Sequence, residues 1–224
     1  MLGHLAAPLD VQEALVNKPH QPTLKLVGDP RLKGVELGGA NSDHPDGNSF
    51  FLKACINVAP EAAEDDYYGK DETGHRGFCH LHGHAAGIPL FDSTVDYVIS
   101  SHVLEHVPDP LRAFHEWERV VKPGGYFLMI VPHHDQLKSD TRPLEWFTME
   151  RLERAYMQRW SHKNIPPADT QPFVGGAYGH WWKFTPELLK AAIERDVGWK
   201  LIMEEDPDSK VGNGFFLAYQ LGEA

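Results

Sequence analysis

The chain has 224 residues, 42% of them hydrophobic and 24% charged, which is ordinary for a globular protein with a sizeable core. Its formal net charge of −11 argues against nucleic acid as a partner, because phosphate binding requires a basic face. No apolar run reaches the length of a membrane span, and two cysteines give no disulfide framework. We therefore expect a cytoplasmic protein with no membrane partner and a single domain over residues 1–224; a homodimer stays open.

Residues 1–30 are predicted to cover the main domain. Asp10 and Glu13 can form a capping box for a short helix that reaches about residue 17. Pro19 and Pro22 are interpreted as the end of this helix. A lid over a substrate site is the alternative role for the segment.

A glycine turn follows the first predicted strand. The strand covers residues 33–37 and leads directly into Gly38, Gly39 and Ala40. Small residues at this point allow a ligand to approach the backbone closely. A glycine pair alone is a weak signal, because most such pairs are only turns.

The second strand is predicted over residues 50–58. In dinucleotide-type sites an acidic residue about 20 positions after the glycine turn binds the ribose hydroxyls. Here the corresponding position is Val58, the nearest acid is Glu61, and the nearest polar alternative is Asn57. The expected carboxylate is therefore absent or shifted.

A histidine-rich stretch covers residues 77–84. As a strand it would place His80, His82 and His84 on one face. Imidazoles about 6–7 Å apart along a strand are too widely spaced to bind one ion without a bend. We expect no native metal site here and favour a polar edge strand or a partner-facing surface; a metal-assisted transferase using residues 75–84 is the alternative.

The strongest pattern is a strand–helix–strand unit over residues 95–133. An apolar strand at residues 95–100 precedes a helix whose N-cap is Asp109, with Pro110 in the first turn. An apolar stripe on that helix comprises Leu111, Phe114, Trp117 and Val121. The turn at residues 122–125 should end the helix before a second strand at residues 126–131. Such crossovers are right-handed and place the two strands parallel.

Residues 87–132 resemble the class I S-adenosylmethionine (SAM)-dependent methyltransferases of the small-molecule, type-11-like group. The matching segments are IPLFDSTVDYVISSHVLEHVPDP and ERVVKPGGYFLMIVP, preceded by VELGGA at residues 35–40. The resemblance implies an α/β fold with a Rossmann-like, seven-stranded, mostly parallel sheet and helices on both faces. A helix at residues 186–195 and strands at 199–204 and 214–221 fit its antiparallel C-terminal hairpin.

The resemblance also implies roles in binding SAM. Glu36 matches the acid near the amino group of the cofactor, and Gly38, with Gly39 and Ala40, forms the turn beneath its methionine part. Ser101 and His102 match the residues beside the carboxypropyl end and the methyl group. The remaining cofactor candidates are His106 from the LEH signature, Asn57 and Glu61 near the ribose, and Ala86, where the family often has an aspartate for the adenine.

Residues 133–183 are predicted to form an insert or lid on the substrate side. His133 and His134 follow the fifth strand, where open α/β sheets bind ligands, and are candidates for a general base. His102 and His180 are the other two candidates. Trp181 and Trp182 are interpreted either as core residues or, with His180, as the lining of an acceptor pocket.

The first functional hypothesis is SAM-dependent methyl transfer to an oxygen or nitrogen of a small molecule. The second is a binding protein that has kept the fold and has altered or lost its cofactor, which the missing ribose and adenine carboxylates favour. The third is the metal-assisted transferase. The acceptor itself is not encoded in any motif.

Overall fold

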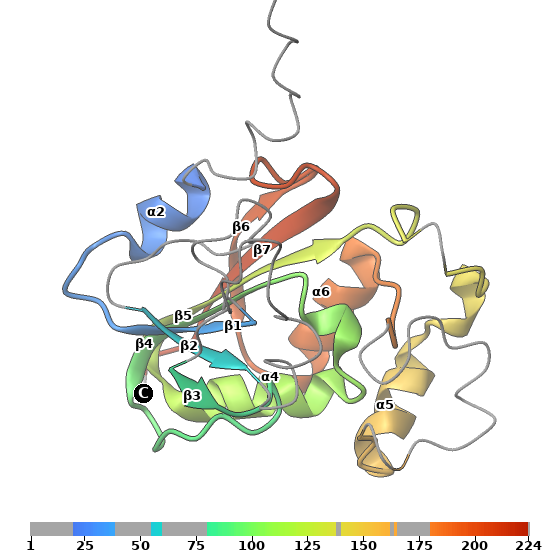
Figure 1. The fold of residues 1–224 in the computed structure, drawn as a ribbon, viewed down its shortest axis with the longest axis horizontal. Helices are drawn as coiled ribbons and strands as arrows, with labels where there is room; N and C mark the ends of the chain where they lie inside the picture. The colour runs from blue at the N-terminus through green and yellow to red at the C-terminus, as the bar shows by residue number, and fades with distance from the viewer. Residues whose placement is uncertain are drawn as a thin grey trace, which may run out of the picture.

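The computed structural model describes residues 20–38, 55–59, 80–137, 140–161, 164 and 180–223. Within these residues one sheet runs in the order β3-β2-β1-β4-β5-β7-β6 (Figure 1). Its strands are β1 (Gly34–Leu37), β2 (Cys55–Ala59), β3 (Leu81–His82), β4 (Val95–Ser101), β5 (Val121–Pro132), β6 (Lys200–Glu205) and β7 (Gly214–Gln220).

The sheet is mostly parallel, as predicted. Strands β3, β2, β1, β4 and β5 pair parallel to one another. Strand β7 pairs antiparallel with β5, and β6 pairs antiparallel with β7, so the C-terminal strands form the expected hairpin. The β6–β7 connection therefore lies at the same edge of the sheet as the carboxyl ends of the parallel strands.

Three helices begin at side-chain caps, and the first of these caps is the predicted Asp109. They are α4 (Pro110–Val120), α5 (Met149–Met157) and α6 (Pro186–Asp196). The side chains of Asp109, Thr148 and Thr185 accept hydrogen bonds from first-turn amides at 3.1, 3.3 and 3.2 Å. Each cap satisfies a backbone donor that has no partner within its helix.

The sheet separates two apolar cores. The larger core contains Phe114 and Trp117 of α4, Leu189 of α6 and Phe127 of β5. The smaller core, under helix α2 (Gln21–Val27), contains Val27 together with Tyr97, Ile99, Leu128, Ile130 and Phe216. Neighbouring residues of β4 and β5 thus alternate between the two cores, as strand geometry requires. Helices lie on both faces of the sheet (Figure 1).

Helix α2 corrects the interpretation of Pro22. The predicted helix at residues 10–17 lies outside the described residues, but Pro22 lies in the first turn of α2 instead of ending a helix. Proline is tolerated there because first-turn amides have no partner within a helix. His20, just before α2, bonds Thr23 Oγ1 at 2.8 Å and Glu205 Oε2 at 3.1 Å, which ties the helix to β6.

The boundary between α4 and β5 also differs from the prediction. Helix α4 ends at Val120, and residues 122–125, interpreted as the stop of the helix, lie inside β5. Val121 leaves the helical stripe because it pairs with Val95 before a register shift in the β4–β5 ladder. Leu111, Phe114 and Trp117 form the buried stripe as expected.

The histidine-rich stretch forms less strand than predicted. Strand β3 contains only Leu81 and His82, and His84 pairs with Gly87 across a turn instead of extending it. His80, His82 and His84 are all exposed. His75 lies outside the described residues, as do residues 138–139, 162–163 and 165–179 of the predicted insert at residues 133–183. No helix among those that the model describes is long and apolar enough to cross a membrane.

Candidate active site

The end of β1 has the backbone geometry that a ligand-binding turn requires. Gly38 adopts φ +71°, and its amide donates to the carbonyl of Val58 at 3.0 Å. Glu36 is 2% exposed and is in register with Asn57 of β2 and Ile99 of β4. Gly39, Ala40 and Glu61 lie outside the described residues, and the side chain of Asn57 is not described.

Polar groups gather at the carboxyl end of β4, next to β1. The hydroxyls of Ser100 and Ser101 are buried and have no hydrogen-bond partner among the described residues. His102 follows with φ +54°, a conformation unusual outside glycine, while its amide donates to the carbonyl of Ile130 at 3.0 Å. Buried polar atoms of this kind are normally satisfied, so this edge is suited to a polar ligand.

Glu105 lies at the centre of three histidines. It belongs to the short turn η1 (Leu104–His106), is 1% exposed, and its Oε1 is 3.7 Å from both His102 Nδ1 and His106 Nε2. Burial raises the pKa of Glu105 to about 8 and lowers the pKa of His102 to about 4. At neutral pH both groups are therefore mainly uncharged, and their contact is polar, not an ion pair.

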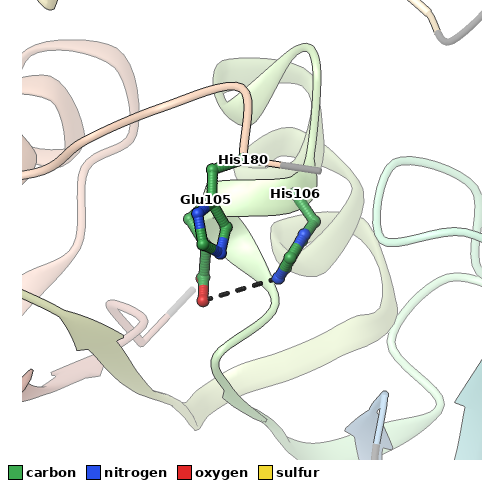
Figure 2. Close-up of side chains that lie close together, drawn as sticks. All are labelled: Glu105, His106 and His180. Atoms are coloured by element: carbon green, nitrogen blue, oxygen red, sulfur yellow. Dashed lines mark ion pairs between the residues drawn. The ribbon is translucent and has the colours of Figure 1, made fainter. Parts of the chain in front are cut away.

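His180 reaches this cluster from a distant segment of the chain (Figure 2). Its ring centroid is 4.8 Å from that of His106, and burial lowers its pKa. The amides of Trp181 and Trp182 donate to the carbonyl of Glu105 at 2.7 and 3.2 Å, which docks the segment on η1. The position of His180 is therefore set by main-chain bonds on the residues after it.

A buried ion pair supports the same segment. Arg142 and Asp140 are 1% and 0% exposed at their side chains, with Arg142 Nη2 2.6 Å from Asp140 Oδ2. Arg142 also donates to the carbonyls of His180 at 2.6 Å and Trp181 at 3.4 Å. Lys183 donates to the carbonyls of Asp140 and Arg142. Arg142 and Lys183 thus each bond backbone carbonyls, and those bonded by Arg142 belong to His180 and Trp181.

The β6–β7 connection contributes a residue that the sequence reasoning missed. Lys210 is 1% exposed, and its burial lowers its pKa, while the nearby carboxylates of Glu36 and Asp208 act in the opposite direction. Asp208 accepts hydrogen bonds from the amides of Lys210, Val211, Gly212 and Gly214, which fixes the loop. The signal in the sequence was a lysine within an otherwise acidic turn, but its burial depends on the path of the loop.

The structure brings together His102, His106 and His180 among the predicted site residues, with Glu36, Gly38 and Ser101 at the ends of the neighbouring strands. His133, at the end of β5, instead bonds Asp206 Oδ1 through Nε2 at 2.7 Å. His134 is half-buried, and its Nδ1 has no hydrogen-bond partner in the described part of the chain. Ala86 is partly buried in the turn between His84 and Gly87.

Trp181 and Trp182 are core residues. Trp182 is 0% exposed and Trp181 is 6% exposed, so the core interpretation holds for both.

Glu105 was not predicted as a site residue. The sequence prediction used His106 of the LEH signature and did not include the glutamate before it. The available signal was a carboxylate with histidines three positions before and one position after it, directly beyond a buried strand.

Residues 52–129 match the family model described as a methyltransferase domain. The chain is also 33% identical over 124 residues to an uncharacterized methyltransferase of Mycobacteroides abscessus, an alignment that covers 49% of this chain and 47% of the relative. Over these residues the chain is similar to the class I SAM-dependent methyltransferases. The cofactor of this family is SAM.

Two further comparisons give similar proteins. A SAM-dependent methyltransferase of Thermotoga maritima has the same fold, with a TM-score of 0.53 at 19% identity over 94% of this chain and 91% of that one. A demethylmenaquinone methyltransferase of Staphylococcus haemolyticus is 43% identical over 63 residues, which are 28% of this chain and 26% of the relative. The chain thus spans about half or less of the length of these curated relatives.

Proposed function

We propose that this chain transfers a methyl group from SAM to an oxygen or nitrogen of a small molecule in the cytoplasm. The observation that carries the proposal is the pairing of two features at one edge of the family fold. Gly38, in a left-handed conformation, follows β1, and two buried hydroxyls without a hydrogen-bond partner in the described part of the chain end the adjacent β4. The acidic net charge and the small-molecule substrate named for the Staphylococcus relative support the acceptor class.

The residues at this edge fit the cofactor. Gly38 allows its methionine part to lie against the backbone, and Ser101 offers a free hydroxyl beside it. Glu36 provides the buried carboxylate for its amino group. Contacts by Gly39, Ala40, Asn57, Glu61, Ala86 and His106 complete the proposed set. SAM supplies a methyl group activated on a sulfonium, so the protein contributes mainly alignment.

His102 is the proposed proton acceptor. Its Nδ1 faces Glu105 Oε1 at 3.7 Å, while its Nε2 is buried and has no hydrogen-bond partner among the described residues. Glu105 thus lies on the Nδ1 side of the imidazole, which leaves Nε2 for the substrate. The acceptor oxygen or nitrogen would bond to the methyl carbon as the carbon–sulfur bond of SAM breaks and releases S-adenosylhomocysteine, and its proton would pass to Nε2. His133, His134 and His180 are the remaining candidates for this role.

The test is transfer of an isotopically labelled methyl group from SAM to a panel of hydroxylated and amino compounds, followed by mass spectrometry. We expect label in at least one acceptor and an equal amount of S-adenosylhomocysteine. His102→Ala should lower the rate at least about a hundredfold, the usual contribution of a general base. His115→Ala is the control, because His115 of α4 pairs with Asp196 of α6 and is not among the residues at the end of β4. Equal rates for the two variants would overturn the role of His102.

One observation favours a second function, a binding protein with an altered cofactor. The buried Lys210 interacts with Glu36, the acid assigned to the cofactor's amino group, and two cations would compete for it. The absence of an acid at the expected ribose position agrees with this alternative. Binding of S-adenosylhomocysteine without transfer to any acceptor in the panel would favour it over methyl transfer.

A further inference from the structure

Two imidazoles and one carboxyl group, those of His106, His180 and Glu105, lie close together (Figure 2). One ligand-type atom each from Glu105, His106 and His180 lies within 4.8 Å of the other two. Glu105 and His106 come from η1, directly after β4, and His180 comes from the segment before α6. The histidine-rich stretch at residues 80–84 has no part in this cluster.

Glu105 points to a ligand that is not part of the chain. Its side chain is buried, and its Oε2 has no hydrogen-bond partner among the described residues. The nearest ring nitrogens, at 3.7 Å from Oε1, are beyond hydrogen-bond distance. A buried carboxyl group is costly unless it is bonded, paired or bound to a metal, so this one is placed for a cation.

Hydrogen bonds to the backbone around the cluster fix the positions of the two segments that carry its side chains. The amides of Trp181 and Trp182 donate to the carbonyl of Glu105, so the segments that carry His180 and Glu105 cannot separate without losing both bonds. Arg142 fixes the carbonyl of His180 from the other side at 2.6 Å. Metal sites need this kind of support, because ligand orientation is set by the bonds around the ligands.

We propose that Glu105, His106 and His180 bind one divalent transition-metal ion of the zinc type, with a coordination position left open. Two imidazoles and a carboxylate suit Zn²⁺, Co²⁺ or Fe²⁺ and exclude a preference for Mg²⁺ or Ca²⁺, which take oxygen ligands. Ligand atoms around tetrahedral zinc lie about 3.3–3.5 Å apart, given bond lengths near 2.0–2.1 Å. Small side-chain rotations bring the three groups to that spacing.

The open position gives the ion a role in the proposed reaction. Glu105 and His106 follow the same end of β4 as His102, and an open position on such an ion would suit an oxygen donor, so the acceptor class becomes a hydroxylated small molecule. A bound ion lowers the pKa of a coordinated hydroxyl, and His102 Nε2 would take its proton. This role rests on the proposed function, whereas metal binding itself does not.

The binding test uses the whole chain after chelation and dialysis. Zn²⁺ is titrated against a chromophoric chelator, and Co²⁺ is followed by its visible absorption, whose intensity reports four-coordinate geometry. We expect one ion per chain, and we expect His106→Ala and His180→Ala each to weaken binding at least tenfold. Glu105→Gln, which keeps the shape of a buried residue, should reduce the Co²⁺ absorption.

Two matched variants separate this site from other histidines. His115→Ala removes an exposed histidine that lies near two carboxylates, Glu118 and Asp196, and His82→Ala removes one from the histidine-rich stretch. Both should leave the tight site unchanged. Circular dichroism and thermal unfolding confirm that each variant is folded.

Each outcome bears on the inference. No tight site in the whole chain, or unchanged affinity in both His106→Ala and His180→Ala, overturns it. Loss of the tight site in His82→Ala also overturns it, because the ion would then belong to residues 75–84. Calorimetry with SAM on the metal-free chain is scored separately, so failure of the metal site and failure of the proposed function are distinguishable.

Discussion

The main-chain carbonyl of Glu105 accepts a hydrogen bond from the amide of Trp181 at 2.7 Å. This bond joins the turn after β4 to the segment before α6, and it brings the rings of His106 and His180 within 4.8 Å between centroids. The candidate site is thus assembled by a backbone contact between remote parts of the chain. Changes that disturb the segment of His180 should reach the site even where they touch none of its side chains.

The variant Arg142→Ala tests whether Arg142 supports the segment that carries His180. It leaves the buried carboxylate of Asp140 without its main partner and frees two carbonyls, so we expect a loss of about 3–5 kcal/mol in the free energy of unfolding. Urea unfolding measures it. The pair of Arg31 and Asp29, whose side chains are 88% and 38% exposed, is the matched control. Arg31→Ala should have no measurable effect, and similar losses in both variants would contradict the structural role of Arg142.

Asp208→Ala tests the loop that presents Lys210. The carboxylate of Asp208 is 2% exposed and accepts four backbone hydrogen bonds, and their loss should lower the free energy of unfolding by roughly 2–4 kcal/mol. Asp208→Asn keeps one accepting oxygen and should lose less. Denaturant titration of both variants checks the order, and equal stability of Asp208→Ala and the unmodified chain would contradict it.

The raised pKa of Asp109 predicts that the free energy of unfolding depends on pH. Burial raises its pKa from 3.8 to about 6 in the folded chain, so its stabilising contribution is complete below about pH 4 and is lost as the pH rises through 6. Asp109→Asn keeps an N-cap acceptor and has no charge to bury. We expect it to raise the free energy of unfolding at pH 7 by at most about 2 kcal/mol and to leave it unchanged at pH 4. Equal effects at both pH values would contradict this.

The interaction of Lys210 with Glu36 predicts that this carboxylate is shared between the lysine and the amino group of SAM. Removing this cation in Lys210→Met takes away a charge that competes with the amino group of SAM for Glu36, so we expect at least threefold tighter SAM binding by calorimetry. Glu36→Gln should weaken binding, and the double variant should bind no more tightly than Glu36→Gln alone. This non-additivity is the signature of two residues that interact. Weaker binding by Lys210→Met would show that the lysine supports the cofactor site.

Local signals were sufficient for most of the fold. The caps Asp109, Thr148 and Thr185 were predictable because a cap is decided within four residues of sequence. Strand β4 was predictable because both its faces are buried, which gives a continuous apolar run. The end of α4 was placed too late because the pairing of Val121 with Val95 is a tertiary contact.

The candidate site was predictable only in part. Glu36, Gly38 and His102 lie at or just after strand ends, where α/β folds place their ligands. The sequence around each of them is therefore sufficient to predict it. The partners of Glu105 depend on which remote segment docks on η1, and neither His180 nor Arg142 signals that docking in its own neighbourhood. Lys210 was missed for the same reason, because its burial beside Glu36 depends on the path of the β6–β7 loop.

Calorimetric titration of the purified chain with SAM, repeated with S-adenosylhomocysteine, tests the central claim most directly. The account predicts one saturable site per chain that both compounds share, and weaker binding after Gly38→Val, because a β-branched residue does not tolerate a φ of +71°. The absence of both heat and thermal stabilisation at millimolar cofactor, for a chain shown to be folded, would contradict the claim that this edge of the sheet binds SAM.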